Sequence, residues 1–99
     1  MARWYERRGF VVVARNWTVR GGELDVVARK GRLVVVCEVK SRSTDAWGSP
    51  WEAMTPLKQS RVRRAGAAFV RALGENGLHV RYDVAAVTGT RLEVMEDAF

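Results

Sequence analysis

Asp25, Glu38 and Lys40 have the residue types and spacing that chemistry on an anionic substrate requires. Side chains of a strand alternate between its two faces, so Glu38 and Lys40 are expected to point the same way. Glu23 and Asp25, in the preceding stretch of alternating residues, are expected to share a face for the same reason. All four charged groups would then gather at one end of a β-hairpin.

The register of this hairpin depends on the turn that joins its strands. A two-residue turn at Lys30-Gly31 pairs positions whose numbers sum to 61. Glu23 is then expected opposite Glu38, with Asp25 diagonal to Glu38. A shift of two residues would change the partners and would leave the charged groups at the same end.

Carboxylates placed side by side repel each other unless a cation neutralises them. Mg²⁺ and Mn²⁺ prefer oxygen ligands, and Asp25, Glu38 and the main-chain carbonyl of Val39 are the expected ligands. Such an ion can polarise a phosphodiester and activate water. Lys40 would orient that water and stabilise charge on the phosphate. The alternative is an exposed Glu38–Lys40 pair at a strand end, which contributes little.

Composition limits the class of protein. With 99 residues, 47% hydrophobic and 28% charged, the chain is expected to fold as a single domain over residues 1–99. The net charge of +6 and the pI near 10.4 favour anionic partners, of which nucleic acid is the commonest. Ribosomal partners and anionic membranes are alternatives. The single Cys37, in an apolar run, is expected to be buried and indicates a reducing, cytoplasmic compartment. No run approaches the roughly 18 apolar residues that cross a membrane.

Apolar periodicity predicts an α/β chain in the order helix, three strands, helix, two strands, with one mixed sheet. Gly9 is expected to stop the first helix, and Thr55 to cap the second, with Pro56 at its first position. We expect a turn over 15–22 and a polar loop over 41–50. The expected helices are 2–8 and 56–73; the expected strands are 10–14, 23–28, 33–40, 79–87 and 91–95.

The long helix carries further candidates. Lys58 and Gln59 fall on the margins of its apolar arc, and we expect them to reach the acids and to support substrate binding. Arg61, Arg64 and Arg71 are expected on the far side, either as a solvated face or as phosphate contacts without sequence preference.

The loop after the triplet carries other candidates. Arg42 is expected to contact a nucleic-acid backbone. Trp47 and Trp51 flank the loop, where they would stack on unpaired bases or cap an edge of the core.

Seven stretches that extend along almost the whole chain match the pattern of a known family, in the same order. They are Gly9-Phe10 to Ala14-Arg15-Asn16-Trp17; Gly22 to Arg29; Glu38 to Arg42; Trp47 to Pro50; Thr55 to Gln59; Tyr82 to Val87; and Asp97-Ala98-Phe99. In these stretches the sequence resembles the YraN-like family of small bacterial proteins. That family is similar to the PD-(D/E)xK nucleases, including archaeal Holliday-junction resolvases and restriction endonucleases. The resemblance implies a restriction endonuclease-like α-β-β-β-α-β core, with a central mixed sheet flanked by helices. It also implies that Asp25, Glu38 and Lys40 are the acid, acid and lysine of the motif.

Members of the family usually carry a Gly-Glu pair in the first helix. Aligned on Gly9, that pair falls before Met1, and Glu6 is not at the matching position. The first helix is therefore expected to be shortened at its N-terminal end.

Three functions follow from these observations. The first is a Mg²⁺- or Mn²⁺-dependent endonuclease that acts on structured DNA, for which a symmetric junction favours a homodimer. The second is a catalytically inactive, nuclease-fold module that binds nucleic acid. The third is a basic structural or partner-binding protein.

Overall fold

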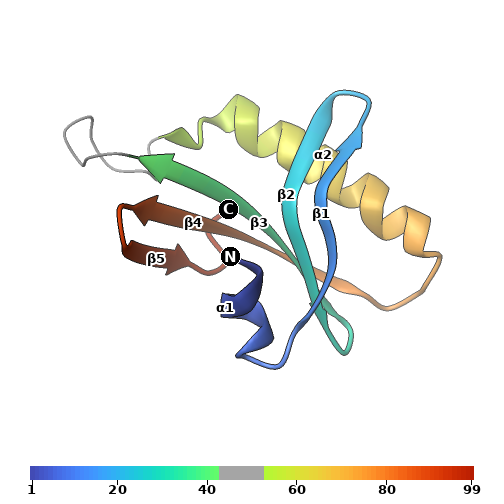
Figure 1. Cartoon of the computed structure of the whole chain (residues 1–99). Helices are drawn as coiled ribbons and strands as arrows, with labels where there is room; N and C mark the ends of the chain where they lie inside the picture. The colour runs from blue at the N-terminus through green and yellow to red at the C-terminus, as the bar shows by residue number, and fades with distance from the viewer. Residues whose placement is uncertain (43–52) are drawn as a thin grey trace.

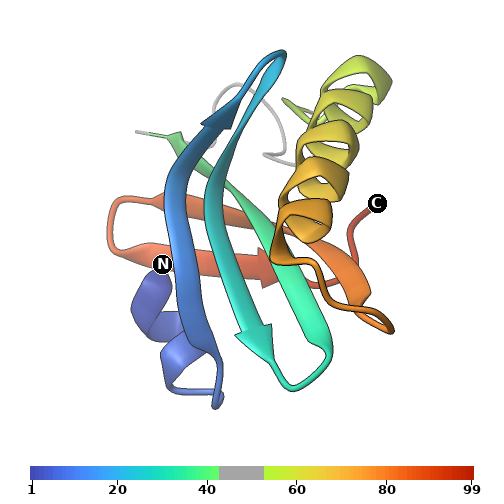
Figure 2. The same cartoon turned by 90° about the vertical axis from the view of Figure 1, so that its right-hand side faces the viewer.

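The chain folds as a five-stranded mixed sheet with one helix on each face (Figures 1 and 2). The computed structural model describes residues 1–42, the last of them by its backbone alone, and residues 53–99. The sheet order is β1-β2-β3-β4-β5, with β3 and β4 parallel and the other neighbours antiparallel. This confirms the α/β class and the predicted order of elements. The elements are α1 (Ala2–Glu6), β1 (Val11–Val19), β2 (Gly22–Lys30), β3 (Leu33–Arg42), α2 (Pro56–Leu73), β4 (His79–Thr88) and β5 (Arg91–Met95).

Strand β3 lies at the centre of the sheet because it is apolar on both faces. Val34 and Val36 pack in the cluster beneath α2, whereas Val35 and Cys37 pack in the cluster beside α1. All four are fully buried, as expected for a strand covered on both sides. Cys37 is thus the buried small residue that the sequence predicted.

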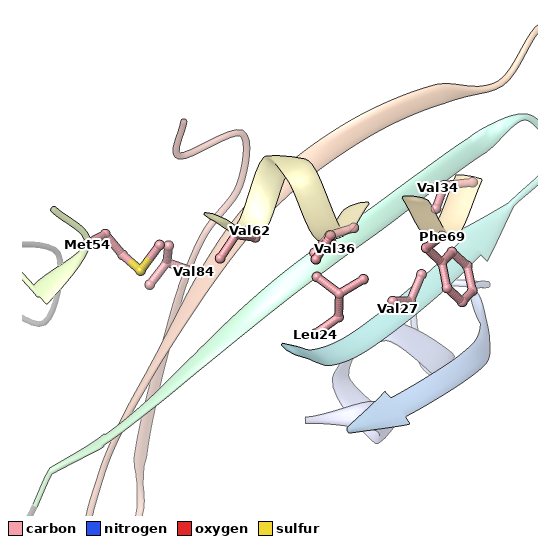
Figure 3. Packing of buried hydrophobic residues seen from close by; sticks show 9 residues of the cluster. Leu24, Val27, Val34, Val36, Met54, Val62, Phe69 and Val84 are labelled. Atoms are coloured by element: carbon pink, nitrogen blue, oxygen red, sulfur yellow. The ribbon is translucent and has the colours of Figure 1, made fainter. Parts of the chain in front are cut away.

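Helix α2 covers one face of the sheet through its apolar arc. Val62 and Phe69 meet the sheet residues Leu24 and Val36 in this core (Figure 3). The helix begins as predicted, because Thr55 Oγ1 accepts a hydrogen bond from Lys58 N at 3.3 Å. In the described part of the chain, no helix is long and apolar enough to cross a membrane.

The first strand is longer than the sequence suggested. The turn expected over 15–22 is wrong, because β1 continues to Val19 and the chain turns at Arg20 and Gly21. The polar side chains in this stretch made it look like a turn in the sequence, but it is a strand whose apolar residues face α2. Trp17 lies edge-to-face against Phe69, with 5.2 Å between ring centroids. The helix before this strand, α1, is shorter than predicted and ends at Glu6.

The predicted register of the second hairpin is also wrong. Val26 pairs with Cys37 and Lys30 with Leu33, so partner numbers sum to 63. The two-residue turn therefore uses Gly31 and Arg32, with Gly31 at φ +60. A glycine with positive φ at the first turn position suits the twist of a hairpin, and this shifts the register by two residues.

The two strands of this hairpin separate at the level of Asp25 and Glu38. The β2–β3 ladder stops at Val26↔Cys37, while β1 and β2 remain paired as far as Val19↔Gly22. Beyond this point β3 pairs with β4 alone within the described sheet. Figure 1 shows the β1–β2 hairpin diverging from β3 there. We call this opening the fork.

A buried hydrogen-bond network ties α1 to β4 and to the C-terminal segment. Tyr5 Oη donates to Asp83 Oδ2 at 2.7 Å, and Arg81 Nε donates to Asp83 Oδ1 at 2.9 Å. The backbone N–H of Asp97 also donates to Asp83, at 3.0 Å. Asp83 is fully buried, and burial raises the pKa of Tyr5 well above its ordinary value, so Tyr5 remains a neutral donor.

Candidate active site

A hydrogen bond joins the separated strands at the fork. The backbone N–H of Val39 donates to Asp25 Oδ2 at 2.9 Å. The backbone N–H of Asp25 in turn faces the Glu38 carboxyl group and lowers its pKa. Contacts between side chain and backbone thus replace the ladder where it ends, and they hold the two carboxylates at the same level of the sheet.

Glu38 is a buried acid that lacks a full set of partners. Its side chain is 8% exposed, and Oε1 has no hydrogen-bond partner among the described residues. Burial, followed by the negative charge of Asp25, raises the pKa of Glu38 from 4.5 to about 7, against the opposing charge of Lys40. The alternative of an exposed Glu38–Lys40 pair is therefore wrong, because the start of α2 covers this end of β3.

Glu38 opens into a cavity of about 280 Å³ between the β1–β2 turn and the start of α2. We call it the Glu38 cavity. Carboxylates come from the strands, and basic groups come from both the sheet and the helix. The charged residues that line it are Glu23, Glu38, Lys40, Lys58 and Arg61, with Met54 and Val62 as apolar members. The structure thus brings Lys58 to Glu38 and Lys40, two of the three residues of the predicted triplet.

Asp25 faces the other side of the sheet. It lines a larger cavity of about 670 Å³ beside α1, here called the Asp25 cavity, together with Glu6, Arg15 and Asn16. Glu23 lines the Glu38 cavity instead, so the two carboxylates of β2 do not enter one cavity. Strict alternation is interrupted at Asp25, since its two neighbours in the chain pack in the clusters on opposite faces. The residue level with it on β1, Asn16, has φ +48, a conformation that asparagine tolerates better than most residues.

The remaining predicted residues lie as follows. The side chain of Val39 packs with the α1-side cluster. Gln59 does not line the Glu38 cavity; its Nε2 donates instead to the carbonyl of Met54 at 2.9 Å and so holds the segment before α2. The side chain of Arg42, and all of Trp47 and Trp51, lie outside the described residues.

Sequence reasoning missed two contributions. Arg61 was expected on the far side of the helix, yet it lines the Glu38 cavity; its spacing of three residues from Lys58 was the available signal. Glu6 was set aside because it did not match the family position, yet it lines the Asp25 cavity. Its place depends on how α1 folds against the sheet, and the sequence pattern carried no signal for that.

A divalent cation at the fork would need side-chain carboxylates together with other oxygen ligands. Among the described residues, no three side chains of the His, Cys, Asp and Glu types surround one point. A metal at the fork would therefore need main-chain carbonyl or water oxygens in addition to Glu38 and Asp25. Mg²⁺ and Mn²⁺ commonly keep several waters in protein sites, so this ligand set is compatible with them.

Comparison with known proteins places the chain in a family. Residues 1–87 match the model of the uncharacterised protein family UPF0102. The chain belongs to the UPF0102 family. A UPF0102 protein of Leifsonia xyli is 43% identical over 86 residues, which cover 87% of this chain and 73% of that protein. One from Beutenbergia cavernae is 48% identical over 89 residues, covering 90% and 75%. One from Geobacter sulfurreducens is 38% identical over 103 residues, covering 99% and 80%. The resemblance to the YraN-like family is thereby confirmed.

Proposed function

We propose that this UPF0102 protein is a Mg²⁺- or Mn²⁺-dependent nuclease that hydrolyses phosphodiester bonds of DNA at the fork. The observation that carries the proposal is Glu38 Oε1, a buried carboxylate oxygen without a partner in the described structure. Leaving such a group unsatisfied costs about 1–3 kcal/mol, and more when it is charged. A cation beside Oε1 would offset that cost, because it would stabilise the charged carboxylate in its buried position.

The proposed ligands are Glu38, Asp25 and the carbonyl of Val39, completed by water. Asp25 raises the pKa of Glu38 through its negative charge, and a divalent ion beside the two groups would favour the charged form of Glu38. With a pKa of about 7, Glu38 exists in both protonated and charged forms at neutral pH, and a bound metal ion would displace its proton to solvent. A bound Mg²⁺ or Mn²⁺ supplies Lewis-acid chemistry to a phosphodiester.

The basic residues of the Glu38 cavity suit the phosphate. Lys40 follows Glu38 on the same face of β3 and is half-buried, so it can orient water and stabilise negative charge. Lys58 and Arg61 approach from α2 and are exposed, so they can bind the flanking phosphates. The carboxylates on the strands would therefore bind the metal ion, and the cations on the helix would bind the substrate.

The order of elements, helix, three strands, helix and strand, agrees with the restriction endonuclease-like core that the resemblance implies, with β5 added. The positive charge and the single reduced cysteine suit a cytoplasmic protein that acts on nucleic acid. A junction with two-fold symmetry would be cut by a homodimer. These parts of the proposal rest on the resemblance as well as on the residues of the fork.

Metal binding is the first test. Calorimetric titration with Mn²⁺ should give a binding isotherm for the wild type that Glu38→Gln and Asp25→Asn abolish or weaken at least tenfold. Glu93→Gln is the charge-matched control, because Glu93 lies on β5, two strands from β3, and has an exposed ion pair with Arg91. Unchanged Mn²⁺ affinity in Glu38→Gln would overturn the proposed site.

Cleavage is the second test. Supercoiled plasmid and branched DNA, incubated with Mg²⁺ or Mn²⁺, should be nicked by the wild type and by Glu93→Gln. Lys40→Met should bind Mn²⁺ normally and yet lose cleavage, since Lys40 acts on the phosphate and water. Metal and DNA binding without any cleavage would replace the nuclease by a binding module. Cleavage that survives both Glu38→Gln and Lys40→Met would refute the assignment.

A further inference from the structure

Helix α2 has a composition that its own stability does not explain. Its 18 residues include five basic residues and no Asp or Glu. Lys58, Arg61 and Arg64 follow one another at intervals of three, a spacing at which like charges repel. Lys58 also stands in the first turn, where the helix dipole disfavours a cation and no acidic residue compensates.

These cations lack anionic partners. In the part of the chain that the structure describes, ion pairs engage Arg29 and Arg81, but none engages Lys58, Arg61, Arg64 or Arg71. All four are exposed, and Figure 2 shows the outer side of α2 without another described element against it. Their charge therefore faces solvent and is available to a large anion.

The four side chains lie along one side of the helix. At about 100° per residue, Arg61, Arg64 and Arg71 fall within an arc of about 80°, and Lys58 lies about 60° beyond Arg61, toward the Glu38 cavity, so the four span about 140°. With a rise of about 1.5 Å per residue, Lys58 and Arg71 are about 20 Å apart along the axis. That length equals about six base pairs of a duplex. The surface begins at Lys58 and Arg61, which also line the Glu38 cavity.

We propose that this surface, the α2 flank formed by Lys58, Arg61, Arg64 and Arg71, docks the phosphate backbone of duplex nucleic acid and leads it to the Glu38 cavity. The choice of nucleic acid as the anion rests on the proposed function. The surface adds to that function a direction of approach, along α2 toward the fork, and a substrate that is double-stranded where it meets the helix.

A duplex fits this flank better than a single strand or a membrane. Surfaces that bind single strands stack bases on exposed aromatic rings. The one aromatic residue of α2, Phe69, is buried against the sheet. Membrane-binding helices expose a continuous apolar face. The apolar face of α2 is already covered by the sheet, and Leu57 is its one strongly exposed large apolar side chain.

The test measures duplex binding without metal, so that it is independent of catalysis. Fluorescence anisotropy with a labelled 20-base-pair duplex DNA in EDTA, from 20 to 200 mM KCl, would compare two double variants of equal charge change. Arg64→Gln with Arg71→Gln removes two cations of the α2 flank outside the cavity. Arg7→Gln with Arg8→Gln removes two exposed cations beside α1.

Four phosphate contacts predict a slope of log K against log[salt] of about −3.6 for the wild type. The Arg64/Arg71 variant should lose about 1.8 of that slope and weaken binding about tenfold or more at 50 mM KCl. The Arg7/Arg8 variant should bind like the wild type. The Arg64/Arg71 variant should keep the thermal unfolding midpoint of the wild type, because both side chains are exposed. The Arg7/Arg8 variant should unfold at a slightly lower temperature, because Arg8 donates a hydrogen bond to the Trp4 carbonyl and lies over the Trp4 ring, so its duplex binding is compared well below that temperature.

Several results would overturn the α2 flank as a duplex-binding surface. They are equal losses in the two double variants, no duplex binding by the wild type at 20 mM KCl, and tighter binding of a single strand of the same length or of anionic vesicles. Because EDTA removes divalent ions, each of these outcomes leaves the metal site at Glu38 untouched. Conversely, duplex binding with the expected slopes would support the α2 flank even if the protein cleaved no DNA.

Discussion

Replacing Glu38 by glutamine should stabilise the metal-free protein at alkaline pH. The pKa of Glu38 rises from 4.5 to about 7 on folding, chiefly because burial disfavours the charged carboxylate. Below pH 4.5 the group is protonated in both the folded and the unfolded chain and costs nothing. Between pH 4.5 and 7 the unfolded chain releases the proton first, so the free energy of unfolding falls as the pH rises. Above pH 7 the loss is complete.

The size of the loss follows from the pKa change. At about 1.4 kcal/mol per pKa unit, the change from 4.5 to about 7 costs the wild type about 3 kcal/mol at pH 8.5. Glutamine keeps the shape of the side chain and carries no charge at any pH. Glu38→Gln should therefore match the wild type at pH 4.5 and exceed it by about 3 kcal/mol at pH 8.5.

Urea unfolding in EDTA at a series of pH values measures this difference directly. The control is Glu93→Gln, which removes an exposed carboxylate and should stay within about 0.5 kcal/mol of the wild type throughout. A Glu38→Gln protein that is no more stable than the wild type at pH 8.5 would refute the reasoning. So would a stability difference that does not vary with pH.

Mn²⁺ should reverse the order of the two proteins if Glu38 binds it. A ligand present at 1,000 times its dissociation constant stabilises the folded state by about 4.1 kcal/mol, which exceeds the deficit of about 3 kcal/mol. At pH 8.5 that gain should appear for the wild type and not for Glu38→Gln. An equal gain in both proteins would mean that Mn²⁺ binds elsewhere.

Three further predictions concern the scaffold, each measured by urea unfolding. Gly66→Ala should destabilise by about 1–3 kcal/mol despite the better helix propensity of alanine, because its Cβ would lie 2.7 Å from Tyr82 Oη; adding Tyr82→Phe should recover part of the loss, and no recovery would place the strain elsewhere. Tyr5→Phe should cost about 1.5–3 kcal/mol by removing a hydrogen bond to the buried Asp83 carboxylate, and an unchanged stability would contradict that role. Thr55→Ala should cost about 1 kcal/mol through loss of the helix cap, whereas Thr55→Ser should be close to neutral.

The elements of the fold could be predicted because their signals are local. The cap at Thr55 directly precedes α2, and the glycine stop at Gly74 directly follows it. The apolar run before Glu38 identified a central strand. The first strand was predicted too short because its pattern is mixed: Trp17 and Val19 are held in the sheet by packing against α2, a contact about 50 residues distant in the chain.

The candidate site could be predicted in part. That Glu38 and Lys40 share a face follows from strand alternation alone, and both line the Glu38 cavity. The cavity that Asp25 lines could not be predicted by the same rule, since alternation breaks at Asp25, next to the positive φ of Asn16. A distortion of this kind depends on how two strands meet and leaves no mark in the period of either one.

The sequence by itself determined which residues are able to do chemistry and which elements carry them, because residue type and periodicity are properties of neighbours in the chain. The tertiary structure alone decided that β2 leaves β3 at Asp25, and that Glu38 is buried with an unpartnered oxygen. The first depends on how the β1–β2 hairpin packs against α2, and the second depends on the start of α2, which closes over Glu38. Burial turns an ordinary glutamate into an acid with a pKa of about 7, and only the folded chain supplies that burial.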